Sequence, residues 1–166
     1  MANQPSILLT GGAGYIGSHT FVALIEAGFT PVILDDFSNS KPAVLERLHR
    51  ITGQPVQCQQ GSVADVALVQ DLIRRNQIAA VIHFAGFKAV GESVAQPLKY
   101  FENNLGGMMA LLRAMEGTTC RTLVFSSSAT VYGDPLRAHQ AGVPSSRGRD
   151  SNKYRFPLLE LRPRCE

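Results

Sequence analysis

Short apolar segments and longer segments with spaced apolar residues alternate along the chain. Most of the short segments are mainly apolar, and the one at residues 79–85 is nearly all apolar, which is typical of a strand that a parallel sheet buries on both faces. In the longer segments, apolar residues recur every three or four positions, as on one face of a helix. This alternation predicts an α/β fold, a doubly wound parallel sheet with helices on both faces. The predicted strands cover residues 7–10, 31–35, 56–59, 79–85 and 122–126, and the predicted helices cover residues 18–27, 41–50, 66–76 and 97–115.

The alternation ends near Pro135, which sets the expected domain organisation. Residues 136–166 show no sustained period, and their arginines are scattered among prolines and serines. The length of 166 residues is sufficient for one domain with its own core. We therefore expect one domain over residues 1–135 and an irregular tail over residues 136–166.

Composition and charge exclude several classes of partner. Apolar residues make up 45% of the chain and charged residues 17%, which is typical of a globular protein. The formal net charge is +3, but five arginines lie within the last 20 residues. Because the preceding part is not basic, we expect no nucleic-acid partner. No segment approaches the ~18 apolar residues that a membrane helix needs, so we expect no membrane partner.

The cysteines and the N-terminus bear on the cellular location. Cys58, Cys120 and Cys165 are far apart and odd in number, so they match neither a disulfide framework nor a metal site. The first residues contain no basic segment followed by a long apolar run, and we predict no signal peptide. These features favour a cytoplasmic protein without a bound metal, whose cysteines are ordinary core or surface residues.

A glycine-rich segment joins the first predicted strand to the first predicted helix. Gly11, Gly14 and Gly17 are spaced three residues apart within Thr-Gly-Gly-Ala-Gly-Tyr-Ile-Gly at residues 10–17. Glycines allow a sharp turn and a close approach of the backbone to a ligand. The start of the following helix directs free N–H groups at an anion. Three such glycines alone also occur in ordinary turns between a strand and a helix.

The end of the second predicted strand favours a functional interpretation of these glycines. Asp35 lies at that end, 18 residues after Gly17. A carboxylate at this point can accept both hydroxyls of an adenosine ribose, and it would repel a 2′-phosphate. The combination predicts a dinucleotide site that prefers NAD to NADP.

Ligands of open α/β sheets bind beyond the carboxyl ends of the strands, so the residues after the fourth predicted strand are further candidates. Ala85 and Gly86 are small enough for a cofactor to lie against their backbone, and Lys88 is placed to meet a phosphate or ribose oxygen. His83 lies within the apolar strand, and we interpret it as a packed, hydrogen-bonded residue rather than a base.

Two polar groups leave alternatives open. Asn103 and Asn104 lie in the long predicted helix over residues 97–115, where they can fix a loop, reach the cofactor or face solvent. Hydroxyls follow the fifth predicted strand at residues 126–128, where they can bind a substrate alcohol or cap the next helix. No His or Asp is spaced to make these serines the nucleophile of a hydrolase.

Four segments are more specific when taken together: TGGAGYIGSHT at residues 10–20, LDDFSNSK at 34–41, VIHFAGFKAVGESVAQP at 81–97 and FSSSATVYGD at 125–134. They resemble the corresponding segments of UDP-glucose 4-epimerase, a family of extended short-chain dehydrogenase/reductases. The resemblance covers residues 6–135 of this chain and only the N-terminal part of a typical family member.

The resemblance implies a Rossmann-type NAD-binding domain. In the family, NAD takes a hydride from C4 of UDP-glucose or UDP-galactose and returns it to the other face, a reaction of galactose metabolism. The resemblance also implies a UDP-sugar substrate and, for the full-length enzyme, a homodimer. It places Ser128 at the reacting oxygen and Thr130 beside the sugar as catalytic residues. It assigns Gly11, Gly14, Tyr15, Ile16 and Gly17 to the pyrophosphate, Asp35, Asp36, Asn39, Ser40, Ser62 and Val63 to the adenosine end, and Phe84, Ala85, Lys88 and Asn103 to the rest of the cofactor.

Three positions depart from the family's pattern. Asp36 replaces the usual asparagine, and Ser62 replaces the usual aspartate that meets the adenine amino group. The third departure concerns the Tyr-x-x-x-Lys pair, whose tyrosine serves as general acid/base. Lys153 stands where the tyrosine is expected, and Tyr154 is followed four residues later by Leu158. We therefore expect little or no epimerase activity from this chain, and hypothesise that the tail is a truncated or out-of-frame end that lacks the UDP-sugar domain.

Two alternative hypotheses remain. The first is an NAD-binding module without catalysis, which NAD binding without turnover of UDP-galactose would favour. The second is a sugar-nucleotide 4,6-dehydratase or decarboxylase. Such relatives usually replace the KAVGES segment and carry an acidic residue after the threonine that follows the fifth strand. Ala129 and Val131 flank Thr130 here, which speaks against the second alternative.

Overall fold

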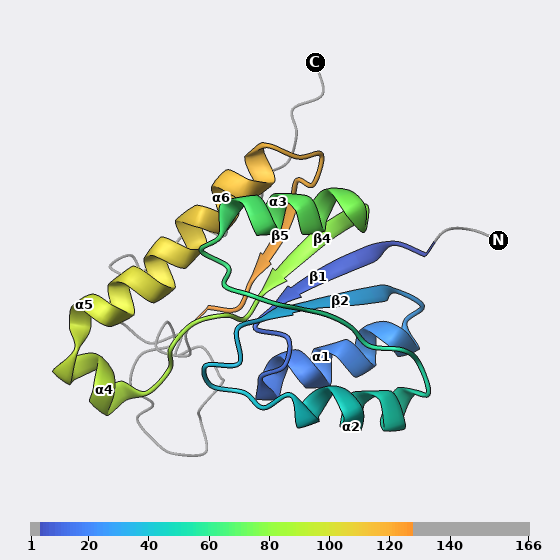
Figure 1. Ribbon diagram of the computed structural model, residues 1–166, viewed down its shortest axis with the longest axis horizontal. Helices are drawn as coiled ribbons and strands as arrows, with labels where there is room; N and C mark the ends of the chain where they lie inside the picture. The colour runs from blue at the N-terminus through green and yellow to red at the C-terminus, as the bar shows by residue number, and fades with distance from the viewer. Residues whose placement is uncertain (1–3, 128–166) are drawn as a thin grey trace, which may run out of the picture.

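The computed structural model describes residues 4–127, which form a parallel sheet between two layers of helices (Figure 1). The strand order is β3-β2-β1-β4-β5, and every neighbouring pair is parallel. The predicted doubly wound α/β fold is therefore confirmed over these residues. The strands are β1 (Ser6–Thr10), β2 (Thr30–Asp35), β3 (Gln57–Gln60), β4 (Ile78–His83) and β5 (Thr122–Phe125).

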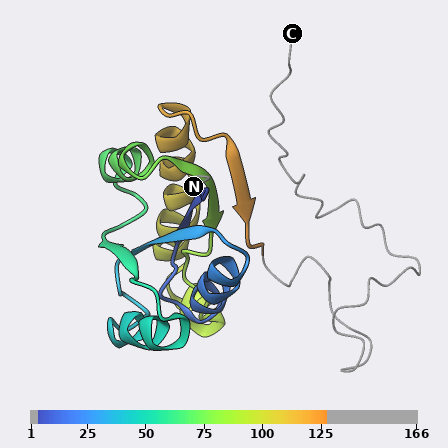
Figure 2. The same ribbon diagram turned by 90° about the vertical axis from the view of Figure 1, so that its right-hand side faces the viewer.

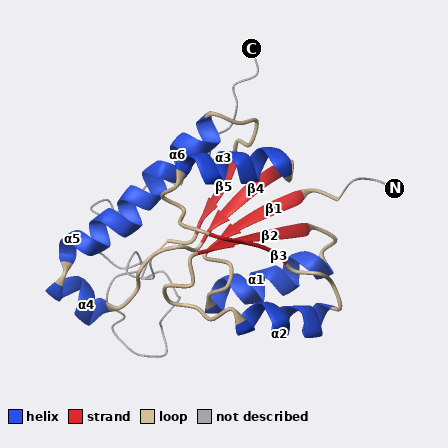
Figure 3. Ribbon diagram, in the orientation of Figure 1, coloured by secondary structure: helices blue, strands red, loops and turns tan. Residues whose placement is uncertain are grey.

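The helices cover both faces of the sheet (Figure 3). On one face lie α1 (Tyr15–Glu26) and α2 (Ala43–Thr52), and on the other lie α3 (Val66–Arg75) and α6 (Gly107–Glu116). Side chains alternate along each strand, so β1 contributes to two separate cores. Leu8 packs with residues of α3 and α6, whereas Leu9 packs with Phe21 of α1 and Leu48 of α2.

The chain reverses its direction across the sheet between β1 and β4. It runs from β1 outwards through β2 to β3, and then crosses back to β4 and β5 on the other side of β1. Figure 2 shows β3 and β5 as the two outer strands. Open α/β sheets bind ligands at the carboxyl ends of the strands where the order reverses, because the two loops leave in opposite directions there. Here this point lies beyond Thr10 and His83, which are paired in register.

Several local signals in the sequence mark the ends of helices, although α2 lies two residues later than predicted. Asp65 caps α3, its Oδ1 accepting a hydrogen bond from the Leu68 N–H over 3.0 Å. Gly28 follows α1 with φ +82°, and Gly53 follows α2 with φ +65°, a left-handed conformation that favours glycine.

The start of α1 was predicted wrongly. The helix begins at Tyr15 rather than at residue 18, because the extended backbone of Gly14 (φ −71°, ψ 175°) already turns the chain into the helix. Gly14 has no side chain to signal a cap. The first helical residues, Tyr15 and Ile16, are exposed and so do not follow the apolar period.

The single helix predicted over residues 97–115 is also a correction. The helical run consists of α5 (Pro97–Tyr100), a wider π-helical segment η1 (Phe101–Gly106) and α6. A short helix that was not predicted, α4 (Val90–Ala95), precedes it. None of its residues is buried, so α4 contributes nothing to the core, and its apolar residues Val90 and Val94 are exposed.

The strands differ from prediction mainly at their ends. β4 begins at Ile78, one residue earlier than predicted, and ends at His83, two residues earlier than predicted. The chain leaves the sheet after Phe84, whose N–H donates to the Thr10 carbonyl over 2.9 Å. β5 ends at Phe125, and β3 lies one residue later than predicted. Within residues 4–127, no helix is long and apolar enough to cross a membrane.

Candidate functional site

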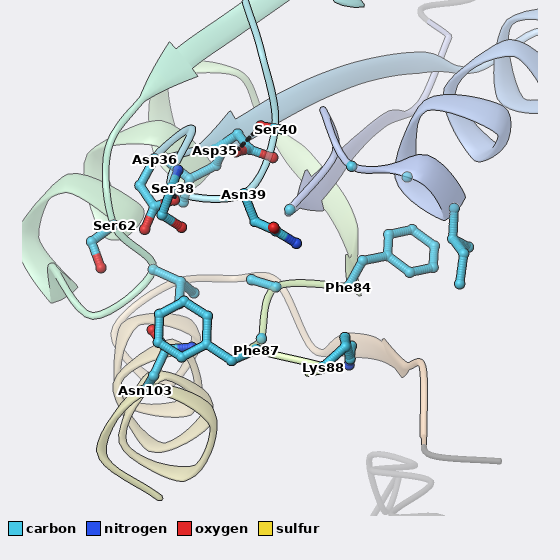
Figure 4. Close-up of a pocket in the computed structure, with 18 of the residues that line it drawn as sticks. Asp35, Asp36, Ser38, Asn39, Ser40, Ser62, Phe84, Phe87, Lys88 and Asn103 are labelled. Carbon is cyan, nitrogen blue, oxygen red and sulfur yellow. Dashed lines mark hydrogen bonds between the residues drawn. The ribbon is translucent and has the colours of Figure 1, made fainter. Parts of the chain in front are cut away.

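A crevice of about 300 Å³ opens at the carboxyl ends of β1, β2 and β4. In Figure 4, Asp35, Asp36, Ser38, Asn39 and Ser40 form one wall, and Phe84, Phe87, Lys88 and Asn103 form the opposite wall. All cofactor-binding residues named from the sequence line this crevice. That they bind a cofactor stays a prediction. They are Gly11, Gly14, Tyr15, Ile16, Gly17, Asp35, Asp36, Asn39, Ser40, Ser62, Val63, Phe84, Ala85, Lys88 and Asn103.

Gly11 in the loop after β1 and Gly17 in the first turn of α1 tolerate no side chain. Gly11 has φ +70°, and a Cβ there would lie 2.6 Å from the Ala85 nitrogen. A Cβ on Gly17 would lie 2.6 Å from the Gly11 carbonyl oxygen and 2.7 Å from the Gly12 Cα. Since real Cβ atoms do not approach backbone this closely, the loop can pack against both β4 and α1 only with glycine at these positions.

The start of α1 presents unpaired donors to the crevice. The first N–H groups of a helix have no partner within it, and no side chain caps α1. The N–H groups of Tyr15, Ile16 and Gly17 are therefore available to a ligand, and all three residues line the crevice. The positive end of the helix dipole lies at the same point, so the arrangement favours an anion such as a phosphate.

Asp35 connects the two loops that border the crevice. Its side chain is almost fully buried. Oδ2 accepts a hydrogen bond from the Ala13 N–H over 3.0 Å, while Oδ1 accepts from the Phe37 N–H over 2.9 Å and from the Ser40 hydroxyl over 2.8 Å. A carboxylate has about four acceptor sites, so roughly one remains. In this geometry Asp35 can accept one ribose hydroxyl. Accepting both, as the sequence predicted, requires the Ser40 hydroxyl to turn away.

The remaining residues of this wall are held by short-range contacts. Asp36 Oδ1 accepts from the Ser38 N–H over 2.9 Å, and Ser62 Oγ accepts from the Ala64 N–H over 3.1 Å. Phe37 adopts φ +58°, which is uncommon for a residue with a side chain. The bond from its N–H to Asp35 stabilises this conformation.

His83 lies behind the opposite wall rather than in the crevice. It is buried, with Nδ1 2.6 Å from Thr10 Oγ1, and its ring stacks on that of Phe125 at 5.9 Å. Burial first, and then the positive charge of Lys88, lower the pKa of His83 from 6.5 to about 4. The structure thus agrees with the interpretation of His83 as a packed, hydrogen-bonded residue.

Other predicted residues vary in their outcome. Asn104 fixes a loop, because its side chain bonds the backbone of Phe87 in both directions. Ser128 and Thr130, the predicted catalytic residues, lie outside the described residues, as do Cys165 and the tail over residues 136–166. Within residues 4–127, no three His, Cys, Asp or Glu side chains lie close enough together to hold a metal ion. Cys58 and Cys120 are free thiols.

The crevice also contains residues that the sequence did not single out as ligands: Ser38, Gly61 and Phe87. Gly61 follows β3 directly, so the same strand-end argument that selected Ala85 could have found it. The placement of Ser38 and Phe87 depends on the conformations of two loops, and no sequence signal indicates it.

Comparison with known proteins identifies the family. The family model described as GDP-mannose 4,6 dehydratase matches residues 8–144. This chain belongs to that family. Among curated proteins, it is 51% identical over 145 residues to the UDP-glucose 4-epimerase of Yersinia pestis, which covers 84% of this chain and 43% of the relative. It is 54% identical over 130 residues to the UDP-glucose 4-epimerase of Pasteurella multocida (strain Pm70), covering 78% of this chain and 38% of the relative.

Solved structures of epimerases share the same architecture. The UDP-glucose 4-epimerase of Stenotrophomonas maltophila, with bound NAD and formylated UDP-arabinopyranose, superimposes with a TM-score of 0.78 at 46% identity over 81% of this chain and 40% of that one. The enzyme from Bifidobacterium longum, in complex with NAD⁺ and UDP, gives 0.75 at 47% identity over 80% and 40%. The resemblance to UDP-glucose 4-epimerases is thus confirmed. The chain spans less than half the length of the curated relatives it matches.

Proposed function

We propose that this chain is the NAD-binding part of an isomerase that interconverts UDP-glucose and UDP-galactose, as in galactose metabolism. One observation carries the proposal. The free amide groups at the start of α1 and the Asp35 carboxylate line the same crevice, where the first can bind a pyrophosphate and the second a ribose hydroxyl. The relatives crystallised with NAD support it.

The residues of the crevice fit the parts of NAD by their chemistry. The N–H groups of Tyr15 and Ile16 bind the pyrophosphate, since they are unpaired and lie at the positive end of α1. The remaining acceptor site of Asp35 takes a ribose hydroxyl. The opposite wall, with Lys88 and Asn103, holds the other end of the cofactor. When bound, NAD supplies the acceptor and donor of the hydride at C4 of the sugar.

The UDP-sugar is the proposed substrate, because relatives bind formylated UDP-arabinopyranose or UDP. Ser128 and Thr130 remain the proposed catalytic residues at the sugar. The sequence of this chain has Lys153 at the place of the expected tyrosine. General acid/base catalysis typically contributes ~10²–10⁴-fold, so we expect turnover to be slow or absent. Tight NAD binding without turnover of UDP-galactose would favour a binding module without catalysis.

Calorimetric titration of the 166-residue chain tests the cofactor. We expect NAD⁺ to bind, and NADP⁺ to bind at least about tenfold more weakly, because the Asp35 carboxylate opposes a 2′-phosphate. Asp35→Asn removes the charge while keeping the side-chain shape. It should lower the affinity for NAD⁺ by about 10–100-fold, which corresponds to the free energy of a hydrogen bond to a charged group. Asp71→Asn is the matched control, since Asp71 pairs with Arg75 on the exposed face of α3.

The outcomes separate the alternatives. Equal binding of NAD⁺ and NADP⁺, or equal losses in the two Asp→Asn variants, would contradict the assignment of Asp35. Absence of NAD⁺ binding by a chain that is folded by circular dichroism would overturn the proposed function. A cytoplasmic location is also part of the proposal, supported by the free thiols of Cys58 and Cys120.

We further propose that the chain forms a homodimer through the helical run from α4 to α6. Exposed apolar side chains recur every three or four residues and form an apolar stripe along α5, η1 and α6, and α4 extends the series on the other side of the bend at Gln96. A two-fold axis can pair such a stripe with its own copy. The stripe consists of Val90, Val94, Leu98, Phe101, Leu105, Met109 and Leu112.

Light scattering during size exclusion tests the dimer. Leu105→Glu should shift the chain towards monomer, because a carboxylate is costly to bury in an apolar interface. Ile51→Glu is the matched control, since Ile51 is an exposed apolar residue of α2 outside the stripe. A wild-type chain that is monomeric at 100-micromolar concentrations, on the order of a weak dimer's dissociation constant, would contradict the proposal.

A further inference from the structure

The segment between β4 and α4 forms much of one wall of the crevice, although it has no regular secondary structure. Gly86, Phe87 and Lys88 all line the crevice. The backbone of Phe87 makes no ladder or turn bond of its own. Instead, its N–H donates to Asn104 Oδ1 over 2.7 Å, and its carbonyl accepts from Asn104 Nδ2 over 3.1 Å. One side chain thus satisfies both polar groups of the peptide backbone at the centre of this wall.

The orientation of the Asn104 amide is determined by its neighbours. Asn103 Nδ2 donates to Asn104 Oδ1 over 3.0 Å, so this oxygen accepts from two donors while the amide nitrogen faces a carbonyl. A flipped amide would face donors with its own N–H groups. Both asparagines lie in η1, the wider segment within the helical run. Such segments are frequent at functional sites.

Gly86 completes the fit between the wall and Asn104. It adopts φ +152°, which residues with a side chain rarely adopt, and a Cβ there would lie 3.1 Å from Asn104 Oδ1. The ring of Phe87 packs on Tyr100 at 5.5 Å, and the Lys99 ammonium lies 5.2 Å from the same ring. The wall is therefore attached to the helical run by the backbone of Phe87 and by the ring of Phe87. Lys88, at the end of the wall, remains exposed.

We propose that Asn104 is a positioning residue that fixes the conformation of the wall at Ala85–Lys88. Asn104 does not itself line the crevice, whereas its neighbour Asn103 does. It acts on the site through the backbone of Phe87 and through its hydrogen bond with the Asn103 side chain. Its effect on cofactor affinity rests on the proposed function, but its effect on the wall does not.

Hydrogen exchange and proteolysis test the wall without any ligand. In Asn104→Ala, the Phe87 amide loses its acceptor and should exchange about tenfold faster, and trypsin should cleave after Lys88 faster by a similar factor. Asn76→Ala is the matched control. It also removes a bond from an asparagine side chain to a backbone carbonyl, the 2.9 Å contact to Leu72 at the end of α3, remote from the crevice. In the control, amide exchange at Phe87 and cleavage after Lys88 should stay within about twofold of the wild-type rates.

Asn104→Asp separates the two bonds. A carboxylate still accepts from the Phe87 N–H but cannot donate to its carbonyl. Phe87 should therefore stay protected while cleavage after Lys88 accelerates at least about threefold. If Asn104→Ala does not fold by circular dichroism, this variant decides. Unchanged exchange and cleavage in the folded variants would overturn the proposal.

Calorimetry adds the link to the site. The wall lies opposite Asp35, so Asn104→Ala should lower the affinity for NAD⁺ about tenfold. The affinity for AMP, which carries only the adenosine half, should stay within about twofold of the wild-type value. Equal weakening of both ligands would overturn the proposed action through this wall. If the wild-type chain binds no NAD⁺, the proposed function fails, while the exchange and cleavage measurements still decide on Asn104.

Discussion

His83 makes the stability of the chain depend on pH in a way that can be worked out from its surroundings. It is buried against Phe125 with one nitrogen at Thr10, and its pKa is lowered from 6.5 to about 4, mainly by burial. Between these values the unfolded chain binds a proton that the folded chain does not. Stability from His83 is therefore fully present above pH 6.5 and is lost as the pH falls towards 4. The shift corresponds to about 3 kcal/mol in total, of which about 2 kcal/mol is lost by pH 5.

Urea unfolding at pH 7 and pH 5 measures this loss. The comparison is with His83→Asn, which cannot titrate and whose amide can still bond Thr10. The wild-type chain should lose about 2 kcal/mol more than the variant between the two pH values. The His83 ring signal in an NMR titration should show no midpoint above pH 5. Equal losses in both chains, or a midpoint near pH 6.5, would refute the reasoning. Lys88→Met should raise the pKa of His83 only partly, because burial remains.

Two further predictions concern single side chains. Gly17→Ala places a Cβ 2.6 Å from the Gly11 carbonyl oxygen, so it should reduce stability by about 1–3 kcal/mol and NAD⁺ affinity at least about tenfold. Gly91→Ala, which meets nothing within 4 Å, should change neither, and equal effects in melting and calorimetry would contradict the argument. Cys58 has a pKa raised to about 11, by burial and then by Asp35, so Cys58 should react with a thiol reagent about 100-fold more slowly in the native chain than in urea, as peptide mapping of the labelled cysteines measures. Equal rates in both states would disprove this shift.

The sequence indicated those parts of the fold that depend on local information. Four of the five strands were found because each is a short, mainly apolar segment, whereas β3 (Gln57–Gln60) is mostly polar and was placed by its position in the alternation. α3 was placed correctly because Asp65 marks its start. α1 was misplaced because Gly14 provides a cap through its backbone alone. The interruption of the long helix at η1 was not predictable, since Asn104 there is bonded to Phe87, 17 residues away in the chain.

The candidate site follows the same division. Gly11 and Asp35 were selected because they lie at strand ends, and Gly17 because of the glycine spacing; all three line the crevice. The fact that Asp35 already accepts three hydrogen bonds was not predictable, because its partners Ala13 and Ser40 reach it through the shapes of two loops. For the same reason, Phe87 was not recognised as part of the wall.

The hydrogen bonds of Asp35 have a consequence for how a dinucleotide binds. They join the loop after β1 to the loop after β2, so the adenosine side of the crevice already has its shape in the empty protein. Binding there costs little conformational entropy of the two loops, because they are already ordered, and preorganised contacts of this kind form readily on encounter. We therefore expect the AMP portion of NAD to bind without rearrangement of these two loops, so that it tethers the nicotinamide portion at a high effective concentration beside the opposite wall.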